Sequence, residues 1–391
     1  MKTAVIVSGV RTPFGSFGGT LSKIGATDLG ALVIDEAISR AGIGKNDVDE
    51  CIMGMVLPCG YGQNPAKQAA IKADLPQDVG AVTVNKVCGS GLKSVMLAAQ
   101  AIQCGDAEVV VAGGMESMSS APYYMEKARW GHRMGPGKIE DHMVHDGLWD
   151  VVNDFHMGMA NEYICEKWNV TREQQDSFAE NSYQKALAAI GGGTFRDEIV
   201  PVKVPGRKGE QKIFDTDECA QPTSYESLSK MRPAFKKDGV GTAGNASIIS
   251  DGAGAVVVMS EERARELGCR IMARIGAQAS AGIDLKYVLM APIHAIPKVL
   301  QKEGATLADV DLFEINEAFS GTSVAINKVL ELDTSLVNVN GGAVALGHPI
   351  GASGTRLLVS ILYEMERRDA KKGLVTLCLG GGEAVAMIVN R

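Results

Sequence analysis

The chain has 391 residues, of which 46% are hydrophobic and 22% charged, and its formal net charge is −7 at pH 7. A chain of this length exceeds the size at which a single hydrophobic core keeps growing, so we expect two or three domains. The negative charge argues against nucleic acid as a general partner, and no apolar run approaches the roughly 18 residues that would predict a membrane span.

The cysteine usage indicates a reducing compartment. Eight cysteines are too sparse for a disulfide framework, and no zinc-type Cys-x2-Cys pair occurs. His142 and His145 are three residues apart, but we interpret them and His156 as binding or packing residues rather than metal ligands. The N-terminus is too short and too lightly charged for a signal peptide. We therefore expect a cytoplasmic protein with free thiols, no metal and no membrane association.

The first third of the chain predicts an α/β fold with short strand–helix–strand units. Such units imply a parallel sheet with right-handed crossovers. From the spacing of apolar residues we expect a strand at residues 3–7, a helix at 28–41 ending at Gly42, a buried strand at 82–87, a helix at 90–103 and a strand at 108–112.

The middle of the chain, from about residue 119 to residue 245, has a different composition. It holds all three tryptophans, most of the histidines, and basic clusters at residues 207–208, 230–232 and 236–237. We interpret this segment as a lobe inserted over the sheet.

The remainder of the chain repeats the N-terminal pattern. The expected elements are a buried strand at 253–259, a short helix at 261–267, a strand at 312–315 that ends at Asn316, a helix from Ala318, a helix through 357–366 and a strand at 374–379.

An internal duplication of about 120 residues is suggested by two similar segments. Val-Asn followed by Gly-Ser-Gly occurs within residues 84–91, and Val-Asn followed by Ala-Ser-Gly occurs within residues 339–354. We therefore expect three parts. These are a first half (1–118 with 250–270), an inserted domain (119–249) and a second half (271–391).

The most informative motif packs five glycines around His348, between Asn340 and Gly354. Glycine lets the backbone approach a ligand closely or adopt a positive φ. Cys88, in Val-Cys-Gly-Ser-Gly, and Cys378, in Cys-Leu-Gly-Gly-Gly, have the same kind of surroundings. Two thiols and an imidazole, each flanked by glycines, suggest nucleophile-and-base chemistry.

Cys88 is placed between a predicted strand and a predicted helix. Its sulfur should then lie at a helix N-terminus, where the dipole favours thiolate and lowers the pKa. The alternatives are a buried structural cysteine at 88, a loop histidine at 348 and an ordinary strand cysteine at 378. The other six cysteines have no comparable context, and we assign them structural roles: Cys51, Cys59, Cys104, Cys165, Cys219 and Cys269.

Asn316 ends a predicted strand in the segment Glu-Ile-Asn-Glu-Ala-Phe. Its amide could position a water or donate to an oxyanion. Alternatively, Asn316 is only the N-cap of the following helix. The sequence around it leaves both interpretations open.

Taken together, these motifs resemble the thiolases, the acetyl-CoA C-acetyltransferases. The resemblance rests on Val-Asn-Lys-Val-Cys-Gly-Ser-Gly, Asn-Glu-Ala-Phe, Gly-His-Pro-Ile-Gly-Ala-Ser-Gly and Cys-Leu-Gly-Gly-Gly, which occur in this order and span the chain. The Asn-Lys-Val before Cys88 is similar to the biosynthetic, acetoacetyl-CoA-forming branch. The implied fold is a layered α/β sandwich of duplicated βαβ halves with an inserted loop domain.

The resemblance also implies residue roles. Cys88 would take an acyl group from a thioester, activated by His348, and Cys378 would remove the α-proton of a second acetyl-CoA. His348 with a water held by Asn316 would form one oxyanion site, and the backbone N–H groups of Cys88 and Gly380 the other. No cofactor is implied beyond coenzyme A thioesters as substrates. The family also suggests a homotetramer, a dimer of dimers.

Coenzyme A contacts are implied for the inserted domain, with two departures from the family pattern. Where relatives carry an Arg near the adenine, Gln221 is the nearest candidate. The family's Met-Gly-x-Gly-Pro is here Val288-Leu289-Met290-Ala-Pro, which predicts tolerance of acyl chains longer than acetoacetyl. The other implied contacts are Leu148, His156, Met157, Phe235, Ala243, Ser247 and Phe319.

Three other functions are less consistent with the sequence. A decarboxylating ketoacyl synthase would share the fold but use His or Asn where this chain has Cys378. A non-enzymatic acyl-CoA- or lipid-binding protein would be expected to lose a reactive group, and none is missing here. A redox or zinc protein would leave the acyl-CoA features unexplained.

Overall fold

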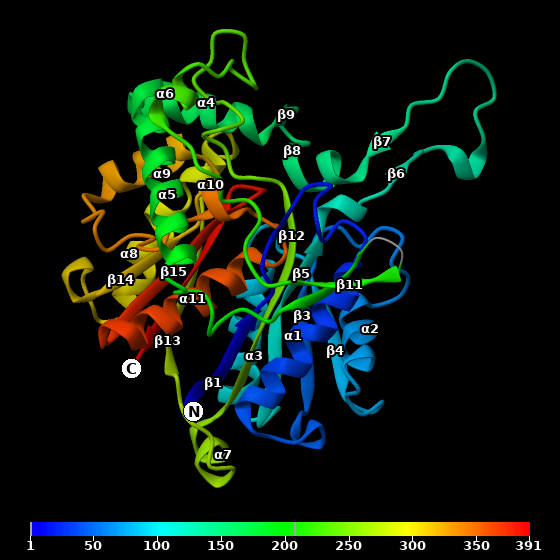
Figure 1. Ribbon diagram of the computed structural model, residues 1–391, viewed down its shortest axis with the longest axis vertical. Helices are drawn as coiled ribbons and strands as arrows, with labels where there is room; N and C mark the ends of the chain where they lie inside the picture. The colour runs from blue at the N-terminus through cyan, green and yellow to red at the C-terminus, as the bar shows by residue number, and fades with distance from the viewer. Residues whose placement is uncertain (1, 207–208) are drawn as a thin grey trace.

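The computed structural model describes residues 2–206 and 209–391 (Figure 1). Arg207 and Lys208, one of the basic clusters noted above, lie outside the described residues. A mixed ten-stranded sheet forms the centre of the described chain. Its strands are β1 (Ala4–Arg11), β2 (Gly15–Ser16), β3 (Glu50–Gly54), β4 (Gly80–Val84), β5 (Val109–Ser117), β12 (Ser250–Ser260), β13 (Ala273–Gly282), β14 (Leu312–Ile315), β15 (Lys372–Leu379) and β16 (Glu383–Asn390).

The strand order is β14-β15-β16-β13-β1-β12-β5-β3-β4, and β2 pairs with β12. The sheet therefore divides into an N-terminal half and a C-terminal half that meet where β1 pairs with β13. The α-helices are α1 (Ala26–Ala41), α2 (Pro65–Lys72), α3 (Ser90–Cys104), α4 (Met157–Trp168), α5 (Arg172–Gly191), α6 (Tyr225–Ser229), α7 (Glu261–Glu266), α8 (Pro292–Glu303), α9 (Ser320–Leu330), α10 (Ala343–Leu346) and α11 (Ser353–Arg368).

The layers follow from the three largest hydrophobic clusters. Side chains of α1 and α2 cover the outer face of the N-terminal half, and those of α8 and α9 cover the outer face of the C-terminal half. Helices α3 and α11 lie between the two halves and share one core with both of them. The predicted layered α/β fold is confirmed.

The central helix pair also bears on the suggested duplication. Gly91 of α3 and Gly354 of α11 occupy equivalent places in the two similar sequence segments. A Cβ at Gly91 would collide with Thr355, and a Cβ at Gly354 would collide with the backbone of Leu92. Glycine at both positions lets the N-terminal ends of the two helices approach each other closely.

Two predictions about the strands need correction. The predicted buried strand at 82–87 ends at Val84, and it is not buried, since Val82 is 41% exposed. This strand is β4, which lies at the edge of the sheet and therefore lacks a neighbour on one side. The residues after it form a turn in which Val87 has a φ of 46°.

The sheet is parallel only in part. Strand β3 pairs in parallel with β4 and β5, and β14 with β15, whereas the other pairs are antiparallel. Strands β15 and β16 are joined by the short turn Gly380–Gly382, in which Gly381 and Gly382 have positive φ. A connection this short can only join antiparallel neighbours. The prediction that consecutive strands pair in parallel therefore holds only where a helix connects the two strands.

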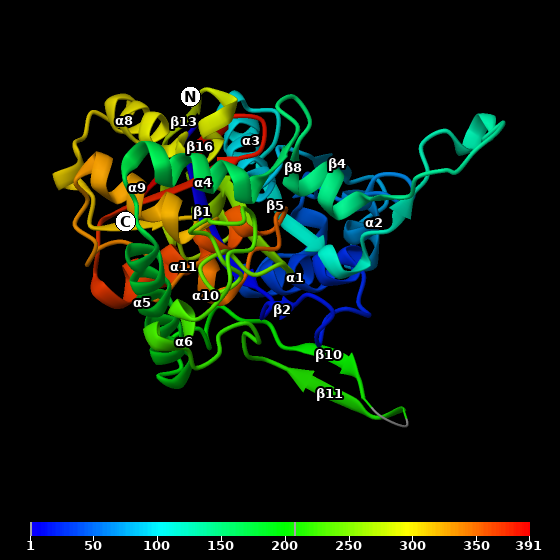
Figure 2. The same cartoon turned by 90° about the horizontal axis from the view of Figure 1, so that it is seen from above.

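The remaining strands among the described residues form three small hairpins in the middle segment. One of them carries a long arm that leaves the body of the protein in Figure 2. Trp130 and Met134 lie on this arm and are 88% and 95% exposed. The hairpins are β6 (Tyr123–Tyr124) with β7 (Glu140–Asp141), β8 (Trp149–Asp150) with β9 (Phe155–His156), and β10 (Val202–Pro205) with β11 (Gln211–Phe214). Among the described residues, no helix is both long and apolar enough to span a bilayer.

Candidate active site

A cavity of about 130 Å³, the central cavity, brings together the two cysteines and the histidine that the sequence singled out. Cys88 reaches it from the turn between β4 and α3, one residue before the N-cap Gly89. Cys378 reaches it from the end of β15, and His348 from the loop between α10 and α11. Three segments that are far apart in the chain therefore meet at one point.

His348 is held in one orientation by Ser353. The Nδ1 atom of His348 lies 2.5 Å from Ser353 Oγ, and that hydroxyl donates its hydrogen to the carbonyl of Pro349 at 2.9 Å. The hydroxyl oxygen must then accept from Nδ1–H, which leaves Nε2 as the acceptor. Burial, with the charge of Arg356 as a second cause, lowers the pKa of His348 to about 3. The imidazole is therefore neutral and its Nε2 can take a proton.

Asn316 faces this imidazole. Its Nδ2 lies 3.4 Å from Nε2 of His348, and its Oδ1 is buried without a partner in the described protein. Helix α9 begins only at Ser320, with Phe319 as its N-cap, so Asn316 is not a helix cap. Because a buried amide oxygen without a partner is unfavourable, this geometry favours an interaction with a bound molecule.

The low pKa expected for Cys88 is not found. Apolar burial raises the pKa of the Cys88 thiol to about 11, although the N–H groups of Gly380 and of Cys88 itself act in the opposite direction. Cys88 lines the central cavity and packs against hydrophobic clusters that include Leu379 and Ile350. Desolvation of the thiolate therefore outweighs the stabilisation that these two N–H groups give it. Cys88 depends on a base for activation.

Burial also raises the pKa of Cys378, and the neighbouring Cys88 raises it further. The side chain is 2% exposed. Once deprotonated, such a thiol is a strong base in a water-poor site, which suits abstraction of a proton from a weak acid.

Most residues predicted to contact coenzyme A also line the central cavity, namely Leu148, His156, Met157, Phe235, Ser247 and Phe319. His156 stacks on Phe235 with ring centroids 5.5 Å apart, and Phe235 packs edge-on against Phe319 at 5.6 Å. Ala243 and Gln221 do not line this cavity. Both are exposed, and the Gln221 side chain donates to the backbone of Glu218.

Sequence reasoning missed several apolar wall residues, among them Met118, Ala246 and Ile350. Ile350 lies within the glycine-rich histidine motif, so its position was a usable signal. Leu289, from the segment that departs from the family pattern, is also part of the wall.

Sequence reasoning also missed Glu116, a buried carboxylate at the end of β5. It accepts hydrogen bonds from the backbone N–H groups of Val56 (3.0 Å), Leu57 (3.2 Å) and Gly351 (2.9 Å). It therefore connects the N-terminal half to the loop that carries His348. Burial raises the pKa of Glu116 to about 7, although the three N–H groups oppose this shift. Nothing in its sequence context predicted this role.

Within residues 2–206 and 209–391, no cluster of three or more His, Cys, Asp or Glu side chains could hold a metal ion. The Nδ1 atom of His145 instead lies 2.9 Å from the hydroxyl oxygen of Tyr124 and 2.9 Å from a carboxylate oxygen of Asp146.

Comparison with known proteins assigns the whole chain to one family. Family models described as the thiolase N-terminal domain and the thiolase C-terminal domain match residues 4–262 and 269–391. The acetyl-CoA acetyltransferase of Pseudomonas aeruginosa is 56% identical over all of both chains, and that of Allochromatium vinosum is 54% identical over 100% of this chain and 99% of the relative. The crystal structure of the Bacillus anthracis acetyl-CoA acetyltransferase superposes with a TM-score of 0.98 at 42% identity, covering 100% of this chain and 99% of the other.

Proposed function

The chain belongs to the thiolase family, and from that premise we propose that Cys88 carries the acyl group in a reversible condensation of two acetyl-CoA molecules to acetoacetyl-CoA and CoA. The thiolase assignment rests on relatives of 50–56% identity over essentially the full length that are named acetyl-CoA acetyltransferase or probable acetyl-CoA acetyltransferase. The observation that carries the residue assignment is the meeting of Cys88, His348 and Cys378 in one cavity.

The first half-reaction acylates Cys88. Its sulfur attacks the thioester carbonyl while Nε2 of His348, which carries the free lone pair of the neutral imidazole, takes the thiol proton. The N–H groups of Cys88 and Gly380 face this sulfur and can stabilise the oxyanion. The carbon–sulfur bond to coenzyme A then breaks, and the leaving thiolate takes the proton of Cys378, which leaves Cys378 as a thiolate and His348 protonated at Nε2.

The second half-reaction forms the carbon–carbon bond. The Cys378 thiolate formed in the first half-reaction removes an α-proton from a second acetyl-CoA, and the enolate oxygen accepts hydrogen bonds from the protonated Nε2 of His348 and from a water held by Asn316. The enolate carbon attacks the acyl group on Cys88, the acyl–sulfur bond breaks, and the Cys88 thiolate takes its proton back from Nε2 of His348. Thiolysis is the reverse sequence.

The test is conversion of acetoacetyl-CoA and CoA to acetyl-CoA by the purified protein, before and after exhaustive chelation. We expect undiminished thiolysis after chelation, because the proposed groups are all protein side chains and backbone N–H groups. Activity that is lost on chelation and restored by zinc would overturn the proposal of a metal-free reaction. Absence of thiolysis under all conditions would overturn the function itself.

We further propose that the protein is a cytoplasmic homotetramer. Exposed apolar side chains on a projecting arm, including Trp130, Met134 and Ile139, support an assembly surface there. Light scattering of the wild type and of a Trp130→Ala, Met134→Ala variant would test this, and a monomeric wild type would contradict it.

We also propose that the chain divides into three parts, which are residues 1–118 with 250–270, residues 119–249 and residues 271–391.

No observation favours a ketoacyl synthase or a non-enzymatic binding protein. A ketoacyl synthase is disfavoured because Cys378 occupies the central cavity, and a non-enzymatic binding protein is disfavoured because both thiols and the imidazole reach that cavity.

A further inference from the structure

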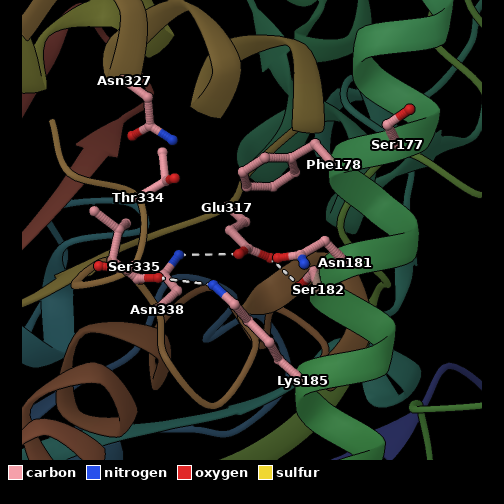
Figure 3. A pocket seen from close by; sticks show the side chains of 11 residues that line it. Ser177, Phe178, Asn181, Ser182, Lys185, Glu317, Asn327, Thr334, Ser335 and Asn338 are labelled. Atoms are coloured by element: carbon pink, nitrogen blue, oxygen red, sulfur yellow. Dashed lines mark hydrogen bonds between the residues drawn. The ribbon is translucent and has the colours of Figure 1, made fainter. Parts of the chain in front are cut away.

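A second cavity, the rear cavity, lies beside the residues that follow Asn316. Its volume is about 430 Å³, and it is bordered by α5, α9 and residues 334–338. Figure 3 shows Glu317 at its centre, between Ser182 on α5 and Asn338. Glu317 is 1% exposed and directly follows Asn316, yet the proposed mechanism does not use it.

Three donors converge on the Glu317 carboxylate. Ser182 Oγ donates to Oε2 at 2.7 Å, the backbone N–H of Val344 donates to Oε2 at 3.2 Å, and Asn338 Nδ2 donates to Oε1 at 2.9 Å. The carboxylate thus joins helix α5, helix α10 and the segment at 338 to the strand end that carries Asn316.

The same network reaches the loop of His348. Ser182 Oγ accepts the N–H of Gly342 at 3.0 Å, and Val344 lies in α10, the element just before that loop. A Cβ at Gly342 would collide with the carboxyl carbon of Glu317. Glycine at 342 is therefore required for the carboxylate to bind the start of α10.

Asn338 secures the other side of Asn316. Its Oδ1 accepts the N–H of Ile315 at 2.9 Å and its Nδ2 donates to the Ile315 carbonyl at 2.8 Å. These two bonds fix which end of the Asn338 amide faces Glu317. Residues on both sides of Asn316 are therefore bound by one connected set of side chains.

We propose that Glu317 is a positioning residue that sets the distance and angle between Asn316 and His348. It touches neither substrate nor the reacting atoms. It acts by holding the strand end of Asn316 and the helix start before His348 in one rigid network, whose buried polar groups are paired. This inference rests on the proposed roles of Asn316 and His348 in catalysis.

The substitution Glu317→Gln tests the network without a change of size. A glutamine has one acceptor oxygen and one NH2 group. If the glutamine NH2 group takes the place of Oε1, it faces the NH2 group of Asn338. The Asn338 amide cannot rotate to present its oxygen instead without losing both of its hydrogen bonds to Ile315. If the glutamine NH2 group takes the place of Oε2, it faces the Val344 N–H. Either placement sets donor against donor, so the network must shift.

The matched control is Glu303→Gln. Glu303 also accepts a backbone N–H, from Ala277, together with the side chains of Asn390 and Lys372. It lies near the start of β15, at the opposite end of that strand from Cys378. Ser182→Ala is a second, milder probe, because it removes only the hydroxyl between Glu317 and Gly342.

The experiment measures kcat and KM for acetoacetyl-CoA thiolysis, α-proton exchange of acetyl-CoA into heavy water, and Tm. Each kcat is divided by the fraction of protein whose Cys88 can be acetylated by acetyl-CoA. For Glu317→Gln we expect kcat and exchange to fall by about 10- to 100-fold, with KM changed less than about threefold. Ser182→Ala should show a smaller fall in the same direction, and Glu303→Gln should keep the wild-type kcat.

The outcomes separate the two proposals. An inactive wild type, or a fully active His348→Ala variant, overturns the proposed function. If His348→Ala loses activity while Glu317→Gln keeps the wild-type kcat per acetylated site, with or without a lower Tm, Glu317 is only structural and this inference is wrong. If Glu317→Gln does not fold, Ser182→Ala decides, and a wild-type kcat in that variant overturns the inference.

Discussion

Ser353 Oγ lies 2.5 Å from Nδ1 of His348 while it donates to the carbonyl of Pro349, so one serine selects the tautomer of the imidazole. The hydroxyl hydrogen is committed to the carbonyl, and the serine can only accept from the ring. The basic lone pair is thereby directed from Nε2 toward Asn316 and away from Ser353.

Ser353→Ala should lower kcat by up to about 100-fold, because the ring loses the acceptor that fixes its orientation and tautomer. Steady-state thiolysis of acetoacetyl-CoA measures this. Ser360→Ala is the control, since Ser360 is a buried serine of the same helix that bonds Glu198 instead. An equal fall in kcat for the two substitutions would contradict this role of Ser353, because loss of any buried hydroxyl in α11 would then be sufficient to lower kcat.

Substitution of Cys88 and substitution of Cys378 should affect different half-reactions. Cys88→Ala should abolish both activity and covalent acetylation by acetyl-CoA. Cys378→Ala should still acetylate at Cys88 but lose α-proton exchange and condensation, where a general acid–base group is typically worth about 10²–10⁴-fold. Intact-mass analysis and peptide mapping decide, with Cys51→Ala as a buried-cysteine control. Acetyl found on Cys378 would reverse the assignment.

Alkylation of Cys88 by iodoacetamide should depend on pH in a particular way. Its pKa is raised to about 11, so the thiol form dominates below that pH and the rate should rise about tenfold per pH unit through pH 7–10. His348, with a pKa lowered to about 3, stays neutral over this whole range and should add no step. Peptide mapping distinguishes Cys88 from the exposed Cys59 and Cys104. A plateau below pH 8 would instead indicate a thiolate–imidazolium pair.

Acyl chain length should be decided in part at Leu289. This side chain belongs to the segment that departs from the family pattern, and it lines the central cavity. We expect measurable turnover of 3-oxohexanoyl-CoA by the wild type. Leu289→Ala should raise its kcat/KM relative to acetoacetyl-CoA by about 10-fold or more, because extra methylene groups gain room.

The control for this prediction is Leu300→Ala. Leu300 and Leu289 are both 4% exposed, but Leu300 lies in α8 outside the cavity wall. Background turnover of 3-oxohexanoyl-CoA by both the wild type and Leu289→Ala would show that chain length is limited elsewhere.

The sequence alone located many of the strands and helices at both ends of the chain, although it missed β3, α2, β13, α8 and β16. It also singled out the residues that we propose for the chemistry. It could do so because apolar periodicity and glycine placement are local properties, readable without knowledge of distant contacts. The helix at 28–41, the strand at 312–315 and the turn that carries Cys88 were all predicted from such local signals.

Only the tertiary structure decided the electrostatics of the site and the partners behind it. Burial raises the pKa of Cys88 despite the nearby N–H groups, and burial depends on side chains such as Leu379 that are hundreds of residues away. The exposure of β4 depends on its place at the sheet edge, which the local pattern does not encode. Glu116 and Glu317 bind backbone N–H groups contributed by distant loops, so no local pattern could have singled them out.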